Sequence, residues 1–201
     1  RVNIITMQIP PFTLSRQYQE IGSEIESEVF KVLKGGKYIG GQEIAKFEES
    51  FSNLIGVKNT IGCNSGTDAL VLALRALDIG VGDEVITSSF SFFATAEAIS
   101  AVGANPVLVD IDPETYLINT ELIEQEINSN TKAIMPVHLF GNAVNMTLIK
   151  SLAKKYDLKV IEDCAQATCT MWENSKVGSI GDIGCFSFFP TKNLGAAGDG
   201  G

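Results

Sequence analysis

The sequence is poor in the residues that bind metal ions or form disulfides. It has one histidine, His138, and four cysteines, no two of which form a Cys-x-x-Cys pair. Zinc sites are usually built from closely spaced cysteine and histidine, so we expect no metal site. We interpret the four cysteines as reduced, buried thiols, which are typical of a cytoplasmic protein.

Long apolar runs and a surplus of basic residues are also absent. No segment approaches the ~18 consecutive apolar residues of a membrane-spanning helix. Residues 1–11 lack the basic and then apolar layout of a signal peptide. Lys and Arg number 15 against 24 Asp and Glu, which gives a net charge of −9, whereas binding to a nucleic acid depends on surplus cations. We therefore expect neither a membrane nor a nucleic acid as a partner.

What the sequence does contain is typical of a globular α/β protein. Hydrophobic residues make up 45% of the 201 residues, which is enough apolar material for a core. Apolar residues recur at helical spacing over residues 15–34 and 44–54, and glycine follows each pattern. These two segments are therefore predicted to be amphipathic helices.

After residue 56, short apolar runs alternate with helical patterns. We predict strands at residues 59–62, 84–87, 106–109, 132–136, 159–161 and 185–188. We predict helices near residues 66–77, 92–102, 120–128 and 145–156. This alternation is typical of a doubly wound, mostly parallel sheet with helices on both faces.

The organisation of the chain is simple. We assign residues 1–14 to an N-terminal extension or arm and residues 15–201 to one domain. Residues 195–201 are rich in glycine and are followed by no closing helix or strand. We therefore expect the domain to be incomplete.

In a doubly wound sheet, ligands bind in the loops after the carboxyl ends of the strands. One such loop is Ser65-Gly66-Thr67, which precedes a predicted helix. The free N–H groups and partial positive charge of a helix N-terminus can bind an anion, and Gly66 would let the backbone approach it closely. The same residues are more often an ordinary helix N-cap, so this loop alone leaves phosphate binding open.

Two further loops place charged residues next to apolar strands. Glu162 and Asp163 follow an apolar run, and a buried carboxylate needs a partner. That partner is either a structural ion pair or helix cap, or a cationic nitrogen of a ligand. Lys192 follows the apolar segment 185–189, where desolvation would lower the pKa of its ammonium group, as a Schiff-base lysine requires.

Together these loops supply the main groups that pyridoxal 5'-phosphate requires of a protein. A helix N-terminus would hold its phosphate, a carboxylate would pair with its ring nitrogen, and a lysine would bind it covalently. Phe90, Phe92 and Phe93 are available to cover the ring.

The same segments resemble the DegT/DnrJ/EryC1/StrS family of PLP-dependent sugar aminotransferases, over nearly the whole chain. The resemblance implies an α/β fold, the large domain of the type I (aspartate-aminotransferase-like) PLP-dependent transferases. The matching segments are Asn64-Ser65-Gly66-Thr67-Asp68-Ala69-Leu70, Asp83-Glu84-Val85-Ile86, Ser91-Phe92-Phe93-Ala94-Thr95-Ala96, Pro136-Val137-His138-Leu139-Phe140-Gly141, Glu162-Asp163-Cys164-Ala165-Gln166-Ala167, and Gly181-Asp182 with Cys185-Phe186-Ser187-Phe188-Phe189-Pro190-Thr191-Lys192-Asn193-Leu194-Gly195.

The resemblance also implies roles for individual residues. Lys192 would bind the cofactor covalently and later shuttle a proton, and Asp163 would keep the pyridine nitrogen protonated. Gln166 would face the ring hydroxyl, and Phe92 would stack on the ring. The remaining cofactor-binding residues, on the phosphate side, would be Ser65, Gly66, Thr67 and Ser187.

Some positions stay open. His138 is either a structural or a catalytic histidine, and Arg16 and Tyr38 lie in segments that resemble substrate-side motifs. At Thr168-Cys169 the family commonly has His-Gly or similar, so we expect the ring pocket to differ in detail from the family's.

By resemblance, we expect a cytoplasmic, homodimeric transaminase that transfers an amino group from glutamate to a keto-sugar linked to a nucleotide. The family's members run to nearly twice this length, so the chain would be the N-terminal part of the large domain, without the small domain. Two alternatives remain. One is a PLP-dependent sugar dehydratase of the same family, which would carry histidine in place of Lys192, and the other is a non-catalytic remnant.

Overall fold

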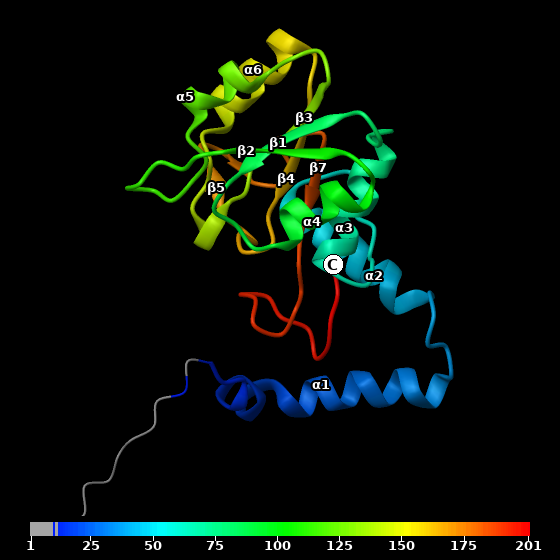
Figure 1. The fold of residues 1–201 in the computed structure, drawn as a ribbon. Coiled ribbons are helices and arrows are strands. Elements are labelled where there is room, and N and C mark those ends of the chain that lie inside the picture. The colour runs from blue at the N-terminus through cyan, green and yellow to red at the C-terminus, as the bar shows by residue number, and fades with distance from the viewer. Residues whose placement is uncertain (1–9, 11) are drawn as a thin grey trace, which may run out of the picture. The chain divides into compact units, whose positions relative to one another are not determined.

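A computed structural model describes residue 10 and residues 12–201 of the chain (Figure 1). Most of the arm expected over residues 1–14 therefore lies outside the described residues. The chain divides into two units, Arg1–Lys46 and Phe47–Gly201. The boundary expected after residue 14 stays a prediction.

The two helices predicted at the start of the chain are confirmed. The first, α1, spans Ser15–Gly35 and ends where Gly36 adopts a left-handed φ of 67° and donates its N–H to the carbonyl of Val32. The second, α2, spans Gln42–Ile55 and ends at Gly56, whose φ is 87°. Glycine ends both helices because it alone adopts this conformation at little steric cost. Among the described residues, no helix is both long and apolar enough to span a membrane.

The second unit is built on a sheet of five parallel strands in the order β2-β1-β3-β4-β7 (Figure 1). The strands are β1 (Glu84–Ser88), β2 (Asn105–Val109), β3 (Thr131–Met135), β4 (Lys159–Asp163) and β7 (Ile183–Cys185). Because β1 lies between β2 and β3, the sheet extends from β1 in both directions. Ligands of doubly wound sheets bind at the carboxyl ends of strands near such a reversal.

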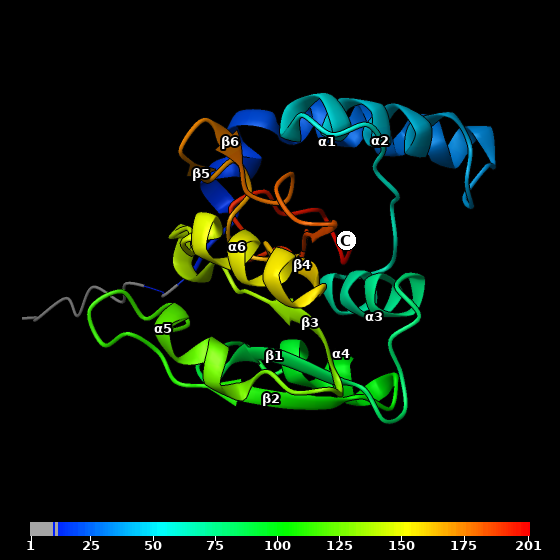
Figure 2. The same ribbon diagram turned by 90° about the horizontal axis from the view of Figure 1, so that it is seen from above.

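Helices cover both faces of this sheet. They are α3 (Gly66–Ala76), α4 (Ala94–Ala101), α5 (Thr120–Ile123) and α6 (Met146–Tyr156). Successive side chains of a strand point to opposite faces. Val85 and Ile161 accordingly join the core cluster under α3 and α4, whereas Ile86 and Val160 join the cluster under α6, which lies against β3 and β4 (Figure 2). The predicted doubly wound parallel sheet is therefore confirmed.

Two predicted strands were wrong in whole or in part. Residues 59–62 form no strand, because no neighbouring strand takes up their backbone groups; the N–H of Gly62 donates instead to the Glu48 carboxylate at 2.9 Å. The strand predicted at 185–188 lies earlier, at 183–185. Its partner β4 ends at Asp163, which pairs with Cys185, so the ladder stops there.

Other elements differ from the predicted pattern in detail. The helix predicted at 120–128 is shorter, since α5 passes into a 3₁₀ turn, η1, at Glu124–Glu126. A second 3₁₀ turn, η2, spans Leu139–Gly141. A small antiparallel hairpin of β5 (Met171–Trp172) and β6 (Ser175–Lys176) was not predicted, because two-residue strands carry no periodic signal.

An aromatic cluster fixes the segment that follows β7. The ring of Phe51 packs edge-to-face on Phe186 and Phe188, with centroids 5.0 and 5.2 Å apart. Such pairs contribute about 0.5–1.5 kcal/mol each beyond the burial of their surface. The cluster thereby holds the chain that leads to Lys192.

Candidate active site

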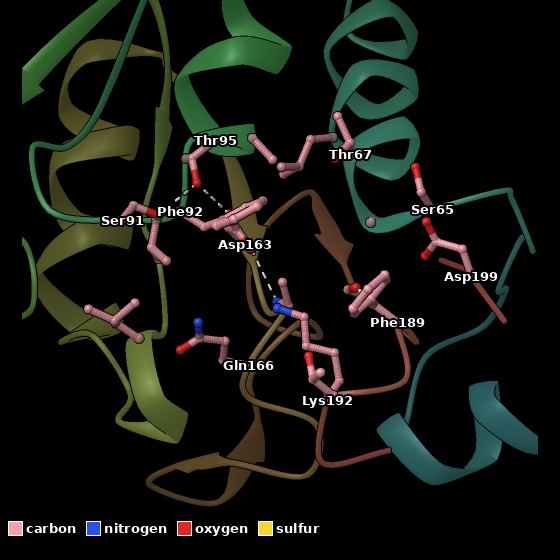
Figure 3. A pocket seen from close by; sticks show the side chains of 18 residues that line it. Ser65, Thr67, Ser91, Phe92, Thr95, Asp163, Gln166, Phe189, Lys192 and Asp199 are labelled. Atoms are coloured by element: carbon pink, nitrogen blue, oxygen red, sulfur yellow. Dashed lines mark hydrogen bonds between the residues drawn. The ribbon is translucent and has the colours of Figure 1, made fainter. Parts of the chain in front are cut away.

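A pocket of about 350 Å³ opens at the carboxyl ends of the parallel strands (Figure 3). It is lined by the loops after β1, β4 and β7 and by the N-terminus of α3, and its size suits a small cofactor. All the candidate cofactor-binding residues from the sequence line this one pocket. They are Ser65, Gly66, Thr67, Phe92, Asp163, Gln166, Ser187 and Lys192.

The N-terminus of α3 forms one wall of the pocket. Ser65 caps the helix, and its Oγ accepts the N–H of Asp68 at 3.0 Å. Gly66 lies so close to Ser187 that a Cβ on Gly66 would be 2.6 Å from the Ser187 Cβ. Glycine therefore allows the helix end and the segment after β7 to meet. The free N–H groups and partial positive charge of a helix start suit an anion at this wall.

Asp163 is the last residue of β4, and its side chain is buried. Its Oδ1 accepts the N–H of Ala165 at 3.1 Å, and its Oδ2 accepts the hydroxyl of Thr95 at 2.9 Å (Figure 3). Burial raises the pKa of Asp163 above its ordinary value, although both hydrogen bonds act to lower it. Each carboxylate oxygen can accept a second bond, so Asp163 remains able to pair with a cationic N–H in the pocket.

The orientation of the Gln166 amide follows from a single contact. Its Oε1 accepts the N–H of Phe140 at 2.8 Å. Because the oxygen is engaged there, the NH₂ group is left as a donor, and Gln166 lines the pocket. It can therefore donate a hydrogen bond to an oxygen of a bound molecule.

Lys192 and Phe92 line the pocket and are less buried than Asp163. Lys192 is half-buried, less enclosed than its apolar sequence context suggested. Its Nζ lies 5.9 Å from the centroid of the Phe92 ring, and that ring is 69% exposed. The backbone N–H of Lys192 donates to Phe189, and a Cβ on Gly195 would lie 2.6 Å from the Pro190 carbonyl oxygen, so the turn that carries the lysine is tightly folded. An amine and an aromatic face thus border the same space.

His138, whose role the sequence left open, forms a structural pair with Glu162. Both side chains are fully buried, and Nε2 of His138 lies 3.1 Å from Oε2 of Glu162. Nδ1 of His138 accepts the N–H of Val144 at 3.1 Å, so the ring is neutral and Nε2 is the donor to Glu162. Among the residues that line the pocket, His138 does not occur.

Glu162 is satisfied by several donors. Besides His138, it accepts the N–H groups of Gly178, Ile180 and Gly181 at 2.9, 2.8 and 2.7 Å. Burial would raise the pKa of Glu162, but these hydrogen bonds outweigh it and hold the pKa below its ordinary value.

Cys164 lies close enough to this pair that the three side chains could share a metal ion. Burial raises the pKa of the Cys164 thiol well above its ordinary value, and the polar atoms of His138 and Glu162 are engaged in hydrogen bonds. The arrangement therefore favours a structural role for these residues, in which their hydrogen bonds connect β4 to neighbouring loops, rather than a metal site.

The position where the family commonly has His-Gly is occupied here by Thr168 and Cys169. Thr168 is buried, and Cys169 is exposed with a left-handed φ of 68°. This conformation favours glycine. Cys169 thus carries a side chain in a conformation that favours glycine, and Gln166, three residues earlier, still lines the pocket.

The sequence analysis gave no role to several residues that line the pocket, and the polar ones among them are Ser91, Thr95, Thr191 and Asp199. A signal for the first two was present, because Ser91 and Thr95 are one helical turn apart in a segment that matches the family. Arg16 and Tyr38 lie in the first unit and are exposed, and a substrate-side role for them stays a prediction.

Comparison with known proteins supports this reading of the fold. Residues 19–201 match the DegT/DnrJ/EryC1/StrS aminotransferase family. A UDP-N-acetyl-3-dehydro-alpha-D-glucosamine 3-aminotransferase of Acidithiobacillus ferrooxidans is 51% identical over 193 residues, which are 96% of this chain and 52% of that protein.

Solved structures agree with the sequence match. Streptomyces venezuelae DesV superimposes with a TM-score of 0.94 at 38% identity, over 97% of this chain and 53% of DesV. NtdA of Bacillus subtilis, solved with bound cofactor PMP, superimposes with a TM-score of 0.91 at 36% identity, over 98% of this chain and 45% of NtdA. The expected fold class, the type I aminotransferase large domain, is confirmed.

The chain spans about half the length of the relatives it matches. The match to the family covers most of α1, all of α2 and the whole five-stranded sheet. The chain belongs to the DegT/DnrJ/EryC1/StrS aminotransferase family.

Proposed function

We propose that the chain provides the cofactor-binding part of a pyridoxal-phosphate-dependent aminotransferase. The protein would transfer an amino group from glutamate to the carbonyl carbon of a keto-sugar linked to a nucleotide. The family match and the sugar aminotransferase of Acidithiobacillus ferrooxidans support the reaction and the substrate class. The observation that carries the proposal is that Asp163, Lys192 and the N-terminus of α3 border one pocket.

The residues of the pocket fit the three chemical demands of this cofactor. The start of α3, with Thr67 and Ser187, offers donors for a phosphate. Asp163 offers a buried carboxylate for the ring nitrogen, and Lys192 offers a primary amine. The close approach of Gly66 to Ser187 leaves no room for a side chain at the phosphate wall, which suits an anion held by backbone N–H groups.

Bound pyridoxal phosphate joins covalently to an amino group and withdraws electrons from the carbon beside it. Asp163 would hold the proton on the ring nitrogen, which keeps the ring able to accept those electrons. Gln166 would donate its NH₂ to the oxygen on the ring, and Phe92 would cover one face of the ring.

Lys192 would act twice. Its amine would hold the cofactor covalently and, when free, would act as the base that takes the proton from Cα of the amino donor. With the uptake of water the donor would become a 2-oxo acid, and the cofactor would carry its amino group to the carbonyl carbon of the keto-sugar, whose oxygen would leave as water.

The proposal includes a cytoplasmic homodimer with a shared active site, as the resemblance implies. The reaction is tested by adding L-glutamate to the pyridoxal-phosphate-loaded whole protein in which the chain occurs, and recording formation of 2-oxoglutarate and the cofactor's absorption change. L-Alanine serves as a matched donor, and Lys192→Ala as a matched variant. Stoichiometric 2-oxoglutarate from glutamate, and none from the variant, is expected. If neither donor gave a 2-oxo acid, the proposed function would be contradicted. If alanine gave product and glutamate did not, the assignment of glutamate as the amino donor would be contradicted.

A further inference from the structure

A chain of hydrogen bonds leads from the rim of the pocket to Asp163. The Ser91 and Thr95 hydroxyl oxygens are 2.7 Å apart, and the Thr95 hydroxyl lies 2.9 Å from Asp163 Oδ2 (Figure 3). Ser91 is half-buried in the loop after β1, whereas Thr95 is 1% exposed on the first turn of α4. In the sheet, β3 lies between β1 and β4. The two hydrogen bonds therefore connect the segment after β1, which includes the start of α4, to the end of β4.

The direction of these bonds is fixed by chemistry. An ionised carboxylate can only accept, so Thr95 donates its single proton to Asp163. The Thr95 oxygen is then an acceptor for the hydroxyl of Ser91. All the donors therefore point toward the carboxylate, which is the arrangement that strengthens the final bond.

We propose that Thr95 is a positioning residue for Asp163 and that Ser91 supports it. This inference rests on the proposed function. The N–H of Ala165 on Oδ1 and the hydroxyl of Thr95 on Oδ2 hold the carboxylate in one plane. They also favour its ionised form in a buried place, and they leave the remaining acceptor positions for the ring N–H of the cofactor.

The other ionisable groups around the carboxylate do not replace this donor. They are His138, Glu162, Cys164, Cys185 and Lys192. In the described part of the chain, the hydrogen-bond donors to the Asp163 carboxylate are Ala165 and Thr95. Thr95 is the one that a side-chain substitution can remove.

Thr95→Val tests the proposal, since valine keeps the shape of threonine and loses the hydroxyl. Thr95→Ser keeps the hydroxyl. Thr87→Val is the matched control, because Thr87 is a fully buried threonine on β1 whose hydroxyl donates to the Met135 carbonyl at 2.8 Å and not to Asp163. Two quantities are measured on the whole protein, the dissociation constant of pyridoxal phosphate by fluorescence quenching and the Asp163 titration by carboxyl ¹³C NMR without cofactor.

Thr95→Val is expected to weaken cofactor binding about 10-fold to 100-fold, as for loss of a hydrogen bond to a charged group. It should also raise the pKa of Asp163, because the ionised form loses a donor. Thr95→Ser should restore both values to within about threefold of the unaltered protein, a margin well below the effect of one charged hydrogen bond. Thr87→Val should leave both unchanged while lowering Tm.

An unchanged Asp163 titration in Thr95→Val would overturn the proposal, as would equal losses of cofactor affinity in Thr95→Val and Thr87→Val. The proposed function and the role of Thr95 can be contradicted independently. If the unaltered protein bound no pyridoxal phosphate, the proposed function would be contradicted, and the NMR titration would still decide whether Thr95 acts on Asp163.

Discussion

Nε2 of His138 lies 3.1 Å from Oε2 of Glu162, in a place where both side chains are inaccessible to solvent. The pair joins the end of β4 to the loop after β3, and Glu162 in turn binds three backbone N–H groups of residues 178–181. Asp163, the next residue, points into the pocket. The two neighbouring carboxylates therefore have different roles. Glu162 binds the loop after β3 and residues 178–181, whereas Asp163 faces the pocket.

Glu162→Gln should destabilise the protein by about 1–3 kcal/mol, because buried hydrogen-bond donors lose their acceptor. Both oxygens of Glu162 accept backbone N–H groups. In either orientation of a glutamine amide, its NH₂ group would therefore face an N–H donor instead of an acceptor. Urea denaturation measures the loss. Because the pKa of Glu162 is depressed in the folded state, its stabilisation is present above the unfolded pKa and is lost as the pH falls through the folded value. The difference between the two proteins should therefore shrink toward low pH, and a constant difference would contradict this assignment.

Gly66→Ala should weaken pyridoxal phosphate binding by about 10-fold or more, because the new Cβ would lie 2.6 Å from the Ser187 Cβ and push the start of α3 away. Cofactor titration by absorption measures this. Gly35→Ala is the control, since nothing lies within 4 Å of its added Cβ. Equal affinities in the two variants would show that the contact with Ser187 does not shape the phosphate wall.

Asp163→Asn should bind cofactor but turn over at least about 100-fold more slowly, because a neutral amide cannot stabilise a protonated ring nitrogen as a carboxylate does. The first half-reaction with glutamate, followed by stopped-flow absorption, isolates this step. A rate near that of the unaltered protein would remove Asp163 from the proposed mechanism.

Cys169→Gly should stabilise the protein by about 0.5–1 kcal/mol, because it removes a left-handed non-glycine residue whose φ is 68°. Thermal unfolding measures the change. Cys169→Ala keeps the strained conformation and should give no such gain, and an equal gain from both variants would point to loss of the thiol as the cause.

Much of this architecture was predictable from sequence. The helices after residue 14 and the parallel strands were recognised because apolar residues repeat at helical or strand spacing, as in α1 and in β1 (84–88). The strand predicted at residues 59–62 was wrong because a short segment becomes a strand only beside a partner strand, and strand pairing is not encoded in the local sequence. The grouping of the candidate residues around one pocket followed from their places after strand ends and from the family resemblance.

The finer features of the site depend on contacts between distant segments. Thr95 and Asp163 are 68 residues apart, and neither residue alone signals their bond. The orientation of the Gln166 amide is likewise set by the backbone of Phe140, 26 residues earlier. The neutral state of His138 follows from Val144 and Glu162 together. Such pairings appear only once the chain is folded.

The central claim is that Lys192 binds pyridoxal phosphate covalently, and one measurement tests it most directly. The protein is loaded with pyridoxal phosphate, reduced with borohydride, digested and mapped by mass spectrometry. The pyridoxyl group is expected on the peptide that contains Lys192, at close to one group per chain, and absent from Lys192→Ala. Its presence on Lys176 or Lys150 instead, or equal labelling of the Lys192→Ala variant, would contradict the account.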